Sequence, residues 1–101
     1  MLLFSMWAAT MGRPRVNVSG KAGYTEGRWG YEALMANRND EAIQWLQDAV
    51  AYQPNNATFW YDLGIAYGRA QKSSAARSAY AQAHQLEPGN ADYTNAAKTL
   101  N

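Results

Sequence analysis

A spacing of 34 residues between matching side chains is the feature of this sequence that most constrains its fold. When the chain is shifted by 34 positions against itself, six pairs align: Gly30 with Gly64, Ala42 with Ala76, Leu46 with Tyr80, Ala49 with Ala83, Pro54 with Pro88 and Asn56 with Asn90. Five of the six pairs are identical, and the sixth exchanges one large apolar side chain for another. Self-similarity at a fixed period indicates a repeat architecture, in which each unit buries its apolar face against its neighbours.

The repeated segments have the periodicity of helices. "DEAIQWLQDAVAY" places Ile43, Leu46 and Val50 at helical spacing, and the alanine-rich "SAARSAYAQAHQLEP" repeats the design. "NADYTNAAKTL" sets Tyr93 and Leu100 on one face of a further helix. No segment has the alternation of a strand, so the sequence predicts an all-α chain.

One stretch, "ATFWYDLGIAYGRAQKSSAARSAYAQAHQLEP", resembles a tetratricopeptide repeat (TPR), a 34-residue helix–turn–helix unit. The marker positions of that family fall on Trp60, Leu63, Gly64, Tyr67, Ala76, Tyr80, Ala83 and Pro88. The resemblance implies an α-solenoid of antiparallel helix pairs in a TPR domain over residues 23–101. Its parts would be repeats at about 23–56 and 57–90 and a capping helix at 91–101.

Two glycines of this stretch lie inside the expected first helix of the second repeat. Gly64 and Ala76 are expected to let the two antiparallel helices approach closely, and this packing would offset the cost of about 1 kcal/mol for a helical glycine. Gly68 is not a marker position of the family. It either opens room for a ligand or is a tolerated weak point near the helix end, and we favour the second interpretation.

The N-terminal part, residues 1–22, combines an apolar segment with a basic, glycine-rich linker. "MLLFSMWAATMG" is shorter than the ~20 residues that span a membrane. Its positive charges, Arg13 and Arg15, follow the apolar run, whereas an export signal carries them before it. We therefore expect a retained segment, with a truncated export signal or a misassigned start as alternatives. The residues expected to dock on repeat one, on a partner or on another copy are Leu2, Leu3, Phe4, Met6 and Trp7.

Composition excludes several chemistries. The chain has no cysteine and one histidine, His84, which rules out disulfides, zinc–thiolate sites and multi-histidine metal clusters. A net charge of +1 gives no strong electrostatic field for binding nucleic acid or an acidic membrane. The glycines before residue 31 do not follow a strand, so no phosphate loop is predicted. We expect no catalytic residues, no metal and no cofactor, and we expect membrane contact, if there is any, only through the N-terminal segment.

The resemblance implies a binding scaffold whose first helices line a concave groove for an extended peptide or a partner helix. The expected groove residues are Arg28, Tyr31, Leu34, Met35, Tyr61, Asp62, Ile65, Arg69 and Asn95. In part of the family, lysine, arginine and asparagine at set groove positions clamp a C-terminal carboxylate. Here Tyr61, Asp62 and Ile65 occupy corresponding positions, which argues against that ligand class.

We therefore expect a non-catalytic protein–protein interaction scaffold, a small adaptor or accessory subunit of a larger, bacterial assembly. The alternatives are a free peptide receptor, a component of envelope secretion or pilus assembly, and the regulatory arm of a catalytic subunit. Self-association is a further option. The cytoplasm is the favoured compartment, with the bacterial periplasm or envelope as the alternative.

Overall fold

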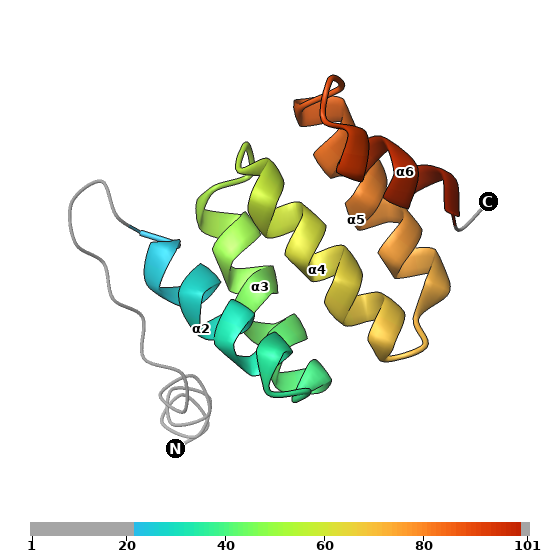
Figure 1. Ribbon diagram of the computed structural model, residues 1–101. Coiled ribbons are helices and arrows are strands. Elements are labelled where there is room, and N and C mark those ends of the chain that lie inside the picture. Colours follow the sequence, from blue (N-terminus) through green and yellow to red (C-terminus); the bar gives the residue numbers. More distant parts are fainter. Residues whose placement is uncertain (1–21, 100–101) are drawn as a thin grey trace, which may run out of the picture.

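A computed structural model describes residues 22–99 of the chain, and these residues form five α-helices and no strand. The helices are α2 (Tyr24–Met35), α3 (Asn39–Tyr52), α4 (Ala57–Arg69), α5 (Ser73–Leu86) and α6 (Ala91–Thr99). Figure 1 shows that α2 and α3 form one antiparallel hairpin, α4 and α5 form the next, and α6 lies on α5 at the far end of the row. The predicted all-α helical repeat fold is confirmed for this part of the chain.

The turns inside the two hairpins have the same backbone geometry at the same position of the repeat. Asn37, between α2 and α3, has φ 62°, and Gln71, between α4 and α5, has φ 68°. The two residues are 34 positions apart. Left-handed backbone is uncommon outside glycine, so its recurrence shows that the period extends to the turns.

Asparagine caps recur with the same period. The Oδ1 atom of Asn56 accepts a hydrogen bond from the backbone N–H of Phe59 at 3.2 Å, and Asn90 does the same for Tyr93 at 3.2 Å. Each bond satisfies one of the N–H groups that a helix leaves unpaired at its start. The 34-residue period therefore also sets where α4 and α6 begin.

Within each hairpin, a glycine on the first helix receives a large side chain from the second. A Cβ atom added at Gly30 would lie 2.5 Å from Leu46 Cγ, and one added at Gly64 would lie 2.5 Å from Tyr80 Cδ1. The expected partner of Gly64, Ala76, is fully buried, but the atoms nearest to Gly64 belong to Tyr80. Glycine is needed because a side chain lies flat against the helix backbone there.

The core joins both hairpins. Leu34 of α2, Leu46 of α3 and Leu63 of α4 belong to one cluster of buried side chains that also includes Ala79 of α5. A smaller cluster of Ala57, Ala83 and Tyr93 attaches α6 to the second hairpin. Each hairpin therefore buries its apolar side against the next element, as expected for a repeat array.

Candidate functional site: the groove between α2 and α4

A cavity of about 580 Å³ lies between the first helices of the two hairpins, and we call it the α2–α4 groove. Helix α2 contributes one side of the groove and the first two turns of α4 contribute the other. The lining is largely apolar, with one carboxylate and one guanidinium. The residues that line it are Tyr24, Thr25, Gly27, Arg28, Tyr31, Thr58, Phe59 and Asp62.

A glycine on α2 lets Phe59 of α4 pack directly against the helix backbone at the groove. A Cβ atom at Gly27 would lie 2.4 Å from Phe59 Cε1, so the phenyl ring occupies the place of a side chain. The residue 34 positions later is Tyr61, whose ring packs 4.9 Å from that of Tyr93. At this position of the repeat, Tyr61 therefore places a ring between α4 and α6. The equivalent residue between α2 and α4, Gly27, has no side chain.

Three large apolar side chains are exposed on one side of α2. Tyr24 is 52% exposed, Tyr31 49% and Met35 55%. Their spacing of seven and four residues places them on the same face of the helix. Tyr24 also meets Phe59 edge to face, with ring centroids 6.0 Å apart. Tyrosines exposed in this way offer a rigid contact surface at low entropic cost.

Asp62 lies half-buried in the wall of the groove. Burial raises the pKa of its carboxyl group from 3.8 to about 6, because the apolar surroundings disfavour the charged form. Among residues 22–99, no ion pair joins Asp62 to a basic side chain. The residue 34 positions before it, Arg28, lines the opposite side. The groove therefore presents an apolar wall with charged groups of opposite sign on its two helices.

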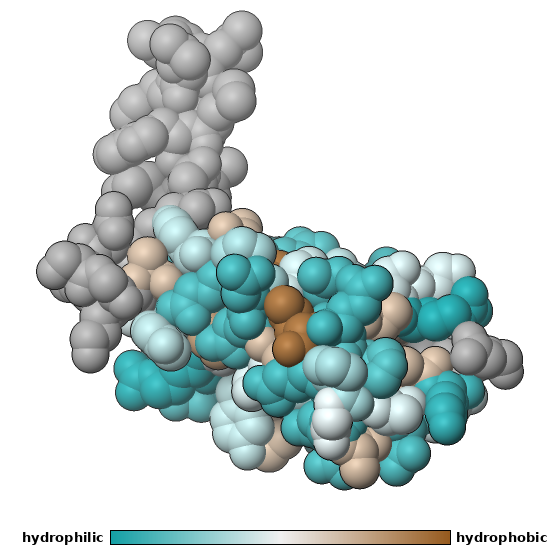
Figure 2. All heavy atoms as spheres, turned by 90° about the horizontal axis from the view of Figure 1, so that it is seen from above, coloured by the Kyte–Doolittle hydropathy of each residue, from teal (hydrophilic) through white to brown (hydrophobic). Residues whose placement is uncertain are grey.

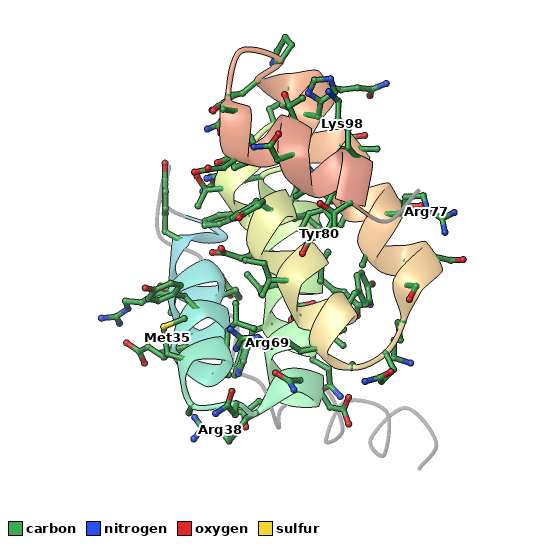
Figure 3. All side chains as sticks on the ribbon, turned by 45° about the vertical axis from the view of Figure 1, so that its right-hand side comes forward. Met35, Arg38, Arg69, Arg77, Tyr80 and Lys98 are labelled. Carbon is green, nitrogen blue, oxygen red and sulfur yellow. The ribbon has the colours of Figure 1, made fainter. Side chains whose placement is uncertain are left out.

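Of the nine residues expected to line a groove, Arg28, Tyr31 and Asp62 meet in this cavity. Met35 lies one turn beyond Tyr31 and is exposed. Figure 3 shows its side chain pointing away from α4 on the outer side of α2. It extends the exposed apolar row of α2 beyond the cavity.

Leu34 differs from the expectation. Its side chain is 1% exposed and belongs to the core, so it cannot face a partner. Gly27 and Leu34 are seven residues apart and share a helix face, and Gly27 already contacts α4. Leu34 instead contributes its backbone oxygen, which accepts a hydrogen bond of 2.9 Å from Arg69 Nη1. Arg69 reaches from α4 towards the end of α2 (Figure 3) and ties the two helices together.

The other three expected residues lie away from the cavity. Tyr61 is half-buried between the rings of Tyr80 and Tyr93. Ile65 is partly buried against the core, and Asn95 is exposed on α6. These side chains belong to the second hairpin and its contact with α6.

Five lining residues were not among the expected ones: Tyr24, Thr25, Gly27, Thr58 and Phe59. All five lie within the first four residues of α2 or of α4. Phe59 could have been found from its counterpart 34 positions later, Tyr93, because aromatic side chains recur there. The recurrence points to a ring that packs between successive first helices.

The expected docking residues Leu2, Leu3, Phe4, Met6 and Trp7 lie outside the described residues. Residues 22–99 hold no group of three metal-binding side chains, and none of their helices has the length and apolarity to cross a membrane. The face of the molecule seen in Figure 2 is mostly hydrophilic around a small hydrophobic patch.

Comparison with protein-family models matches residues 30–71 to the TPR repeat. The matched segment begins at Gly30 in α2, includes all of α3 and α4 and ends in the turn before α5. No curated protein matches the chain. TPR repeats generally mediate protein–protein interactions and are typically non-catalytic. The helix pairs, the 34-residue register of their caps and close contacts, and the matched repeat together show that the chain contains a tetratricopeptide repeat, and they support its place in that family.

Proposed function

We propose that this chain is a non-catalytic adaptor that binds a partner protein in the α2–α4 groove. The observation that carries the proposal is the pair of half-exposed tyrosines, Tyr24 and Tyr31, beside a cavity of about 580 Å³. Side chains that only fill the core would be buried, whereas large apolar side chains left in solvent beside a cavity are typical of binding surfaces.

The groove favours a partner segment with an apolar or aromatic anchor. The anchor would rest on Phe59 between Tyr24 and Tyr31. Helix α2 has 12 residues and is therefore about 18 Å long, which matches five or six residues of extended peptide. Arg28 and Asp62 would then fix the direction of the bound segment through their opposite charges.

Comparative affinity capture from native cells, with quantitative mass spectrometry, tests the proposal. The baits are the wild-type chain, the double variant Tyr24→Ser/Tyr31→Ser, and Gln85→Ser as the control. Gln85 is exposed on α5, outside the groove. The groove variant is expected to lose a partner that the wild type and the control both retain. Equal retention by all three baits would contradict binding through the groove.

The same complex distinguishes an adaptor from a free peptide receptor. A shortened peptide from the captured partner is titrated into the chain by calorimetry, beside the intact partner. An adaptor within an assembly is expected to bind the folded partner more tightly than the peptide, because contacts outside the groove add to the interface. Equal affinities would favour a peptide receptor.

A further inference from the structure

A pair of tryptophans lies at the end of the helix row where the first hairpin has no described neighbour. Trp29 of α2 and Trp45 of α3 are both partly exposed, and their rings meet edge to face with centroids 4.7 Å apart. Trp29 is on the opposite side of α2 from the face that meets α4, because it lies two residues after Gly27. We call the surface formed by Trp29 and Trp45 the N-terminal face.

The equivalent positions of the second repeat show how such a surface is buried inside a repeat array. The counterparts of Trp29 and Trp45, 34 residues later, are Leu63 and Ala79. Each of these is 2% exposed and belongs to the buried cluster that joins the second hairpin to the first. In the second repeat, therefore, these positions are covered by the preceding repeat. A repeat array usually ends in a polar outer face, whereas this end carries two large aromatic rings.

One exposed acidic side chain lies near Trp29 of the N-terminal face. Glu32 is exposed on α2, three residues after Trp29, and its counterpart in the second repeat is the fully buried Ala66. Residues 1–21 carry apolar side chains and then the basic residues Arg13, Arg15 and Lys21, with no acidic residue among them. The apolar and basic groups of that segment thus complement an aromatic surface with the Glu32 carboxylate nearby.

We propose that the N-terminal segment of this same chain covers the N-terminal face, with its apolar residues 2–7 on Trp29 and Trp45. The contact would be intramolecular and would take the place of a preceding repeat. The length of the chain allows it. The 10 residues of 12–21 span up to about 33 Å when extended, while α2, along which the face lies, is about 18 Å long.

Paramagnetic broadening in the full chain tests the contact. Because the chain has no cysteine, Ser5→Cys places a single nitroxide label within the apolar segment. The readout is the set of tryptophan indole N–H signals. Trp60 serves as the internal reference, since its Nε1–H donates to Pro54 O at 2.7 Å in the turn before α4. Lys98→Cys provides the matched control label on α6, at the far end of the row (Figure 1).

The label at position 5 is expected to broaden the indole signals of Trp29 and Trp45 and to leave that of Trp60 sharp. The label at position 98 is expected to leave Trp29 and Trp45 sharp. Adding Leu3→Ser/Phe4→Ser to the first labelled chain should restore both signals without changing the far-UV circular dichroism. Sharp Trp29 and Trp45 signals with the label at position 5 would overturn the proposal.

A mixture of two labelled forms of the chain shows whether the segment that covers the N-terminal face belongs to the same molecule or to a second copy. Isotope-labelled chain without nitroxide is combined with nitroxide-labelled chain of natural isotopic abundance. An intramolecular contact predicts no broadening in this mixture. Broadening of Trp29 and Trp45 there would assign the face to a second copy and overturn the proposal. Broadening confined to the backbone amides of Tyr24 and Tyr31, with the label at position 5, would place the segment in the α2–α4 groove and overturn it as well.

Discussion

The same substitution at two glycines of α4 is expected to have opposite effects on stability. Gly64 and Gly68 lie one helical turn apart. A Cβ atom at Gly64 would lie 2.5 Å from both Cδ1 and Cε1 of Tyr80, whereas one at Gly68 would meet no atom within 4 Å. Neither glycine has a positive φ angle, so alanine fits the backbone at both positions.

Two contributions set the size of the effect. Replacing a helical glycine by alanine gains about 0.5–1 kcal/mol, because glycine loses more backbone freedom on folding. Gly68→Ala is expected to gain this amount or slightly less, since it lies near the helix end. Forcing a methyl group against a packed ring costs about 1–3 kcal/mol. Since the backbone contribution is common to both variants, the Gly64→Ala variant should be less stable than Gly68→Ala by about 1–3 kcal/mol.

Urea unfolding followed by far-UV circular dichroism measures both free energies. The control is a double-mutant cycle with Tyr80→Ala, which removes the ring that opposes the new methyl group. In the Tyr80→Ala background, Gly64→Ala should cost less than in the wild type, or should stabilise the chain. Equal stabilisation by Gly64→Ala and Gly68→Ala would refute the close contact between Gly64 and Tyr80.

Three further substitutions test local features by the same unfolding assay. Asp62→Asn should stabilise the chain by about 2–3 kcal/mol well above pH 6 and not at all below pH 3.8. The raised pKa means that ionising the wild-type carboxyl group is unfavourable in the folded state. This energetic cost is absent at low pH, where the carboxyl group is protonated in both states, and is complete above pH 6. A difference between Asp62→Asn and the wild type that does not change with pH would contradict the burial of the carboxyl group. Trp60→Phe removes the hydrogen bond to Pro54 O and should cost about 0.5–1.5 kcal/mol, whereas no loss would show that solvent replaces the bond. Asn56→Ala removes the cap of α4 and should cost about 1 kcal/mol, while Asn56→Asp, which retains the acceptor, should cost less.

The packing within each hairpin could be predicted from the sequence because it repeats. The offset of 34 residues aligns Gly30 with Gly64 and Leu46 with Tyr80, and in both hairpins the glycine contacts that large side chain. The sequence pairs Gly64 with the small residue Ala76, whereas the atoms nearest to a Cβ at Gly64 belong to Tyr80. A shared period shows that two positions are equivalent, but it does not show which atoms on the opposite helix lie nearest.

The groove was harder to predict because it depends on how successive hairpins meet. Helical spacing gives the face of each residue but not the angle at which α4 lies against α2. Phe59 packs on Gly27 and thereby turns Leu34 towards the core and away from solvent. The same contact leaves Tyr24 and Tyr31 at the surface. The residues that line the groove therefore follow from one contact between repeats, whose sequence signal is the aromatic side chain that recurs at Phe59 and Tyr93.

The central proposal is that a partner protein binds in the α2–α4 groove, and site-specific photocrosslinking in native cells tests it most directly. A photoreactive phenylalanine analogue replaces Tyr31 in the groove or, as the control, Gln85 on α5. The proposal predicts a crosslinked partner from position 31 and none from position 85. A partner crosslinked from position 85 and not from position 31 would contradict it.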